Sequence, residues 1–319
     1  MTAGDAASAG RARRFAATAA AIGCALVFAV IVASAYIRLS QAGPGWSGPV
    51  GLARIVHRLA ASAEAVLVVM LAAVCWGARR QWPGGARAAA AIAALSVFLA
   101  ALGIVTAEMQ PPPVTLGNLL GGMALLGMFG WLRLQARSAV PSACSATALW
   151  VWGGVALLAL QITLGGLVSA HHAAASCATF PACDGEWWPA GASFALLDLI
   201  RAPDPVPGAA LLADPARRAL HMAHRFSAAI MLLYWVALTL VLRSRDRAAA
   251  RGAAAVTAML LVQGLIGVIV VGSGAAVAAA VAHNAWAALT VAAAVGAAHY
   301  SGLSRGAGTS AARQTVTSK

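Results

Sequence analysis

Charged side chains are scarce in this sequence. They account for 10% of its 319 residues, whereas apolar residues account for 61%. Ordinary soluble domains carry far more charge, so the composition excludes that class and indicates a membrane protein. The sequence also lacks a basic patch interleaved with aromatic residues, and its net charge of +13 therefore does not indicate nucleic-acid binding. The excess of arginine is typical of topology signals and of attraction to anionic lipids of the bilayer.

A cleavage site of small residues is missing from the N-terminal apolar stretch, which is also too long for a signal peptide. We therefore interpret this stretch as a membrane span. A span requires about 20 mainly apolar residues. Eight stretches meet this requirement and predict an all-α, polytopic membrane protein with eight transmembrane helices. They run roughly over residues 15–37, 54–77, 87–106, 114–132, 146–168, 219–242, 253–272 and 277–301.

The positions of the arginines predict the orientation of these spans, because short cytoplasmic loops are enriched in Lys and Arg. Four clusters all fall on one side of the membrane. Both termini are therefore predicted to be cytoplasmic, and a long loop over residues 169–217 lies on the outer side. The clusters are Arg11, Arg13 and Arg14; Arg79, Arg80 and Arg87; Arg133 and Arg137; and Arg243, Arg245, Arg247 and Arg251.

An internal repeat divides the chain into two halves. The second and sixth spans begin alike, with IVHRLAASAEAVLVV and MAHRFSAAIMLLYWV. Asn118 follows His57 by 61 residues, and His283 follows His224 by 59. Each half holds four spans, so the copies share one orientation. We expect two parallel-repeat four-helix bundles, an N-terminal half over 1–138 and a C-terminal half over 139–319.

The second half carries two histidines at a common depth, His224 and His283. A single histidine on an apolar helix is more often a hydrogen-bonded interior residue than a ligand. Two imidazoles on two helices of one bundle, however, can ligate the iron of a planar macrocycle from both faces. Zinc is the rival metal, but it requires about four nitrogen or sulfur ligands, and no such set lies at this depth.

Other polar residues lie near the same outer boundary. His221 precedes the sixth-span histidine by one turn and could meet a substrate, a proton or a propionate. Arg225 and its counterpart Arg58 could pair with heme propionates or extend to lipid headgroups. Glu64 lies about two turns below His57 on the same face, and an acid inside the membrane is a functional-site hypothesis.

Two of the five cysteines lie in the outer loop, within SCATFPACDGEWWP. Cys177 and Cys183 face the oxidising side of the membrane, where a disulfide that closes a small loop is permitted. We favour this disulfide, and free or metal-binding thiols are the alternatives.

At HMAHRFSA, AHNAWAAL and QITLGGLVSAHHAAASCATFPACDGEWWP, the chain resembles the heme A synthase family, over about residues 15–301. The resemblance implies a membrane oxidoreductase for cytochrome oxidase assembly, which oxidises a ring methyl of heme O to the formyl of heme A. It implies that His224 and His283 bind heme b, that heme O binds in the first half, and that Cys177 and Cys183 form an outer-loop pair. It further implies a bacterial inner-membrane location, a heme O synthase as substrate donor, and an electron donor.

The first half departs from the family pattern. It lacks the family's first cysteine pair, Arg54 stands where the family commonly has a glutamate, and Asn118 replaces a histidine. His57 would then hold the substrate iron alone, with one face open, and Glu64 or His221 would take over from the missing glutamate.

The alternative is a catalytically inactive bis-histidine heme protein in oxidase assembly or electron transfer. A transporter fits less well, since the polar groups lie away from the bilayer midplane. The sequence leaves the oligomeric state open, homo-oligomers included.

Overall fold

The computed structural model describes residues 3–40, 46–105, 111–138, 146–197 and 213–303. Within these ranges the protein contains eight helices long and apolar enough to cross a membrane. The prediction of an all-α, polytopic membrane protein is therefore confirmed. The helices are α1 (Ala3–Leu39), α2 (Gly48–Gly77), α3 (Pro83–Val105), α4 (Pro112–Arg137), α5 (Ala146–Ala170), α7 (Pro215–Arg243), α8 (Arg247–Gly272) and α9 (Val277–Leu303), with short 3-10 turns η1 (Ala173–Ala175) and η2 (Ala195–Leu197).

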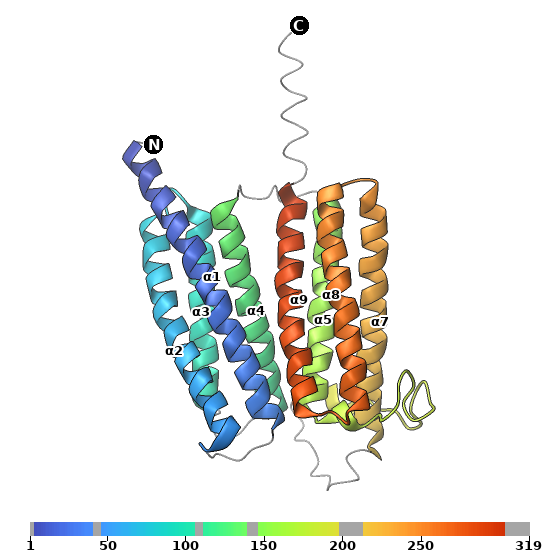
Figure 1. Ribbon diagram of the computed structural model, residues 1–319. Coiled ribbons are helices and arrows are strands. Elements are labelled where there is room, and N and C mark those ends of the chain that lie inside the picture. Colours follow the sequence, from blue (N-terminus) through green and yellow to red (C-terminus); the bar gives the residue numbers. More distant parts are fainter. Residues whose placement is uncertain (1–2, 41–45, 106–110, 139–145, 198–212, 304–319) are drawn as a thin grey trace.

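The helices form two four-helix bundles that stand side by side (Figure 1). In the first bundle α1 and α3 each pack against both α2 and α4, and in the second α5 and α8 each pack against both α7 and α9. Consequently α2 faces α4, and α7 faces α9, across the diagonal of a bundle. The two bundles meet where α9 packs against α1 and α4, and where α4 packs against α5.

Helix α7 begins earlier than its hydropathy predicts. Asp214 caps it by accepting a hydrogen bond from the backbone N–H of Ala216 at 2.9 Å, and Pro215 occupies the first turn, where its missing N–H is not needed. The outer loop is accordingly shorter than the expected 169–217, since α5 runs to Ala170. This extension adds a polar turn to α7 on the N-terminal side of His224.

Small residues allow the helices of the first bundle to pack closely, as is common in membrane proteins. Gly23 of α1 lies against the ring of Phe129 of α4, and a Cβ placed on Gly23 would come within 2.5 Å of that ring. Phe129 is fully buried. The second bundle repeats this arrangement with Gly154 of α5 and the buried ring of Trp235 of α7.

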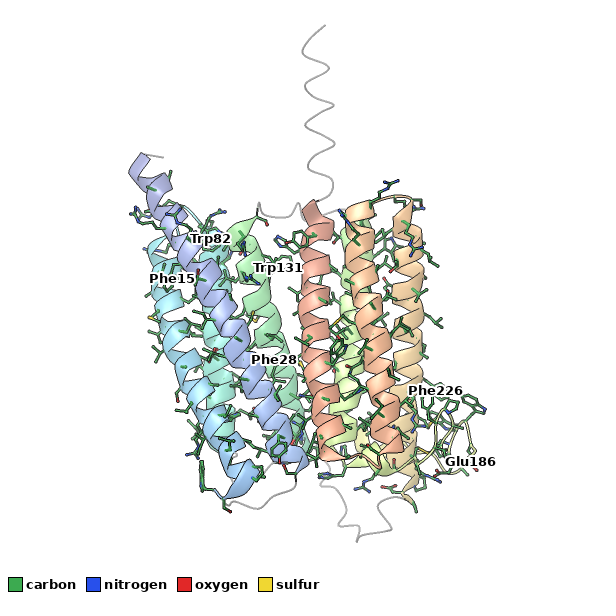
Figure 2. The ribbon with its side chains drawn as sticks, viewed as in Figure 1. Phe15, Phe28, Trp82, Trp131, Glu186 and Phe226 are labelled. Atoms are coloured by element: carbon green, nitrogen blue, oxygen red, sulfur yellow. A yellow bond between two sulfur atoms is a disulfide. The ribbon has the colours of Figure 1, made fainter. Side chains whose placement is uncertain are left out.

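Both termini of the described chain lie at the end of the bundles opposite the disulfide loop (Figure 1). Aromatic side chains gather toward both ends: Figure 2 labels Trp82 and Trp131 near the end that holds the termini, and Phe226 near the other. Trp188 of the outer loop is exposed and stacks on Phe226, with ring centres 6.2 Å apart. Such positions are typical of aromatic belts at the two membrane interfaces.

We expect Gly23→Ala to lower the stability of the first bundle, because the added methyl group has to displace the buried Phe129 ring. Overpacking of this kind costs about 1–3 kcal/mol. Thermal denaturation of the protein in detergent measures the effect. Gly103→Ala in α3 is the matched control, since a Cβ there meets nothing within 4 Å. Equal stability of the two variants would contradict this packing.

Candidate functional site

The second bundle brings His224 and His283 together. They project from α7 and α9, the two helices that face each other across the diagonal, and their ring centres lie 6.4 Å apart with planes inclined by 71°. A metal–imidazole nitrogen bond is about 2 Å long, so two imidazoles on opposite sides of one metal ion have ring centres about 6 Å apart. The observed separation therefore suits a single metal ion between the two rings.

A cavity of about 420 Å³ surrounds these rings. Its wall is mainly apolar and comes from α5, α7, α8 and α9, with contributions from α1 and α4 of the first bundle. Within the described residues no group of three His, Cys, Asp or Glu side chains is placed to hold a metal ion. Two imidazoles fall short of the protein ligands that zinc usually takes, whereas they complete the axial ligands of a heme.

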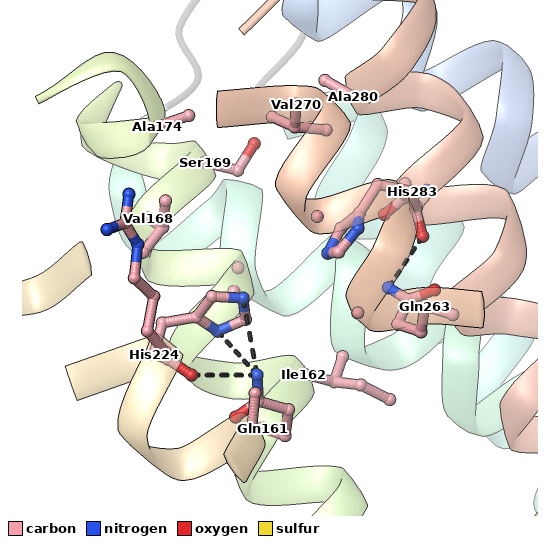
Figure 3. Close-up of a pocket in the computed structure, with 18 of the residues that line it drawn as sticks. Gln161, Ile162, Val168, Ser169, Ala174, His224, Gln263, Val270, Ala280 and His283 are labelled. Atoms are coloured by element: carbon pink, nitrogen blue, oxygen red, sulfur yellow. Dashed lines mark hydrogen bonds between the residues drawn. The ribbon is translucent and has the colours of Figure 1, made fainter. Parts of the chain in front are cut away.

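His224 sits in a socket formed by α5. The amide Nε2 of Gln161 lies 3.0 Å from His224 Nδ1 and 3.4 Å from its Nε2, and it donates to the His224 carbonyl at 3.1 Å (Figure 3). One turn along α5, Gly165 lies under the ring: a Cβ there would be 3.0 Å from His224 Cε1. The glycine leaves room for the imidazole, and the glutamine holds it.

His283 has a corresponding socket on α8. Gln263 Nε2 donates to the His283 carbonyl at 3.0 Å, and a Cβ on Gly267 would lie 3.3 Å from His283 Cε1 (Figure 3). In both cases the glutamine precedes the glycine by four residues, as QITLG and QGLIG. Each histidine thus rests on a Gln-x-x-x-Gly segment of the helix that precedes its own in the chain.

His221 and Arg38 are among the further polar residues that line the cavity. His221 is 5% exposed, and its Nδ1 has no hydrogen-bond partner within the described chain. Arg38, from the outer end of α1, reaches across to donate to Ser169 Oγ at 3.2 Å. An arginine at the mouth of an apolar cavity is well suited to pair with carboxylates.

Arg225 has a different environment from the one expected. It lines the cavity, but its guanidinium donates to four carbonyls of the disulfide loop, those of Cys177, Thr179, Pro181 and Ala182, at 2.8–3.2 Å. The expectation was a pairing with propionates or lipid headgroups. The sequence does not show that the loop folds back over α7, so these carbonyl acceptors could not be anticipated.

The disulfide between Cys177 and Cys183 is present, as predicted. Both cysteines are 1% exposed and pack against Met222 of α7. Phe180, inside the closed loop, contributes to the cavity wall. The loop therefore forms part of the outer boundary of the cavity, and Arg225 fastens it there.

Two neighbouring arginines of α7 contact other described residues between α5 and α7. Arg218 pairs with Asp184, and Arg217 pairs with Asp214 and donates to the His171 carbonyl at 2.9 Å. His171 is buried, and burial together with the Arg217 charge lowers its pKa. His171 packs within the loop and does not line the cavity.

The candidate site residues of the first half do not line this cavity. His57, Arg58, Glu64 and Asn118 are absent from its wall. Glu64 is 7% exposed and accepts a hydrogen bond from Ser96 at 2.9 Å. The Arg58 guanidinium lies 4.4 Å from the centre of the Trp46 ring, a cation–π contact. His57 and Asn118 are both half-buried, on helices that face each other across the first bundle.

A second cavity, of about 650 Å³, lies between the bundles and shares Met123, Leu158 and Ile162 with the first. Gln135 of α4 lines it and is 9% exposed. This cavity contains none of the histidines discussed above.

Sequence reasoning missed Gln161, Gln263 and Arg38. A glutamine within an apolar span is itself a signal, because polar groups in hydrocarbon are costly and need partners. The position of Arg38 was also a signal, because it stands at the opposite end of its span from the arginine cluster Arg11, Arg13 and Arg14.

The fold and the site together define a polytopic helical membrane protein with a bis-histidine cavity in its second bundle. Residues 50–295 match the COX15-CtaA family, described as cytochrome oxidase assembly proteins. The match covers most of the sequence, and the chain belongs to this family. Among curated proteins, the heme A synthase of Shewanella oneidensis is 29% identical over 240 residues, which are 63% of this chain and 71% of that protein.

We expect Gly165→Ala to impair any metal binding between the two histidines, because the new methyl group would push the His224 ring out of its socket. Titration of the purified protein with heme, followed by absorbance, measures the loss. Gly296→Ala in α9 is the control, since a Cβ there meets nothing within 4 Å. Undiminished binding by Gly165→Ala would show that the socket does not set the ring position.

Proposed function

We propose that this protein is a heme A synthase, which oxidises a ring methyl of heme O to the formyl of heme A for cytochrome oxidase. Membership of the oxidase assembly family and the similarity to a heme A synthase support this activity. The observation that carries it in the structure is the pair of facing imidazoles 6.4 Å apart within an apolar cavity.

A resident heme b between His224 and His283 fits the residues present. The rings have a suitable separation, glycines make room beside both, and Nδ1 of His283 is buried without a hydrogen-bond partner in the described chain. A heme with two imidazole ligands supplies one-electron transfer. Around it, the apolar wall of α5, α7, α8 and α9 excludes water, while Arg38 and His221 offer charge and hydrogen bonds to acidic side chains of the ring.

The substrate heme O is assigned to the first bundle. His57 is the candidate ligand of its iron, Asn118 on the facing helix is a poor ligand that can donate hydrogen bonds, and Arg58 stands at the outer end. The nearly buried Glu64 is the remaining acid on the His57 face and is the candidate to take up protons from the substrate.

The surroundings follow from the same assignment. The protein lies in a bacterial inner membrane with both termini cytoplasmic, which places the Cys177–Cys183 disulfide on the oxidising side. A heme O synthase supplies the substrate, and a separate donor or acceptor exchanges electrons with heme b.

A second function, a non-catalytic bis-histidine heme protein in oxidase assembly or electron transfer, is favoured by one observation. Arg54 stands at the position where the family commonly has a glutamate, so that acid is missing here.

The bound heme provides the first test. We expect the purified protein to show a low-spin heme b spectrum, and His224→Ala and His283→Ala each to abolish it through loss of an axial ligand. His172→Asn is the control, since His172 is exposed in the outer loop. Normal spectra in both alanine variants would rule out these ligands.

The reaction itself provides the second test. In a cell that makes heme O but lacks heme A, expression of the protein should yield heme A, detected by chromatography of extracted hemes. Glu64→Gln should reduce that yield while leaving the heme b spectrum intact. Persistent heme b without any heme A from the unmodified protein would favour the non-catalytic function instead.

A further inference from the structure

Gln161 contacts the His224 ring directly. Its amide nitrogen lies 3.0 Å from Nδ1, closer than to Nε2 at 3.4 Å, and also donates to the His224 carbonyl (Figure 3). The amide oxygen of Gln161 is buried and has no hydrogen-bond partner in the described chain. The Gln161 amide thus donates hydrogen bonds through Nε2, while its acceptor Oε1 has no hydrogen-bond partner in the described chain.

A histidine that binds a metal through Nε2 carries its proton on Nδ1, and this N–H almost always donates to a neighbouring acceptor. Within the described residues, the side chain of Gln161 lies within hydrogen-bond distance of His224 Nδ1. Its amide can reverse the positions of oxygen and nitrogen by a half-turn about the Cγ–Cδ bond.

We propose that Gln161 is a positioning residue for the ligand His224: it fixes the ring through Nδ1 and thereby directs Nε2 to the iron. The proposal rests on the assignment of heme b to this site. Without metal, the amide N–H donates to Nδ1, and the imidazole proton resides on Nε2. With iron bound at Nε2, the imidazole proton is on Nδ1. The Oε1 atom of the turned amide then accepts a hydrogen bond from Nδ1–H.

The turn gives up the donation to the His224 carbonyl and in exchange satisfies Nδ1–H and the buried amide oxygen. Binding of a metal by His224 would supply the driving force. No covalent bond in the protein breaks, and no electron is transferred.

The second socket supports the interpretation. Gln263 likewise donates to the carbonyl of its histidine at 3.0 Å, and its Oε1 is buried without a partner in the described chain. Gly165 and Gly267, each four residues after the glutamine, leave space for the rings. Two helices therefore present a glutamine and a glycine to the two histidines. They differ in that Gln161 lies within hydrogen-bond distance of a ring nitrogen, whereas Nδ1 of His283 has no partner in the described chain.

Two substitutions in the full-length protein test the proposal. Gln161→Leu removes the acceptor, so we expect heme b binding to weaken by roughly 10-fold or more, the size usual for such partners, and the midpoint potential to rise. Gln161→Glu has nearly the same shape and is a stronger acceptor, so it should keep the heme and lower the potential by making His224 more electron-donating. Gln135→Leu, another buried glutamine, should change neither quantity.

The measurements are heme titration, redox titration of the heme spectrum, and electron paramagnetic resonance of the oxidised protein. A purely structural role for Gln161 would lower thermal stability in the leucine variant but would not shift the potential in opposite directions. Wild-type affinity and potential in both variants would overturn the proposal. This failure is distinct from failure of the proposed function, which would appear as absence of bound heme or of heme A in the unmodified protein.

Discussion

Polar groups inside a lipid bilayer have to find partners within the protein, because hydrocarbon offers none. The second bundle meets this constraint incompletely. His221 Nδ1, His283 Nδ1, Gln161 Oε1 and Gln263 Oε1 are all buried without a hydrogen-bond partner in the described chain, and all four residues line one cavity. Unsatisfied groups of this kind are costly when scattered. Four of them line one cavity around two facing imidazoles, where a bound ligand with polar edges would satisfy them.

The bundle geometry explains how two histidines 59 residues apart come to face each other. Since α5 and α8 each pack against both α7 and α9, they separate the two histidine-bearing helices and set the width of the gap between them. The same two helices supply the glutamines and glycines of the sockets. Helices α5 and α8 therefore also orient the two imidazole rings. The distance between the rings and their orientation are set by the same pair of helices.

Much of the fold was available from the sequence, because a membrane span has a long apolar signature and arginine clusters mark its ends. The meeting of His224 and His283 followed from the repeat. The partners of the arginines did not, since they depend on where the outer loop lies: Arg225 binds loop carbonyls, while Arg38 reaches the cavity. The glutamine sockets were missed for a related reason. Contacts between residues on different helices, 63 positions apart for Gln161 and His224 and 20 for Gln263 and His283, have no local signature.

The two halves are unequal in a way that suits a division of labour. His57 lies on α2, which packs against α1 and α3, and neither Ala3–Leu39 nor Pro83–Val105 contains a glutamine. The histidine of the first half thus lacks the socket that each histidine of the second half has. Under the proposed function, a resident heme b would benefit from ligands held in place, whereas a substrate that binds and is released would require weaker binding. Asn118 is a poor iron ligand, so the proposed substrate site in the first half would hold a heme through His57 alone, which suits the exchange that the proposed function requires.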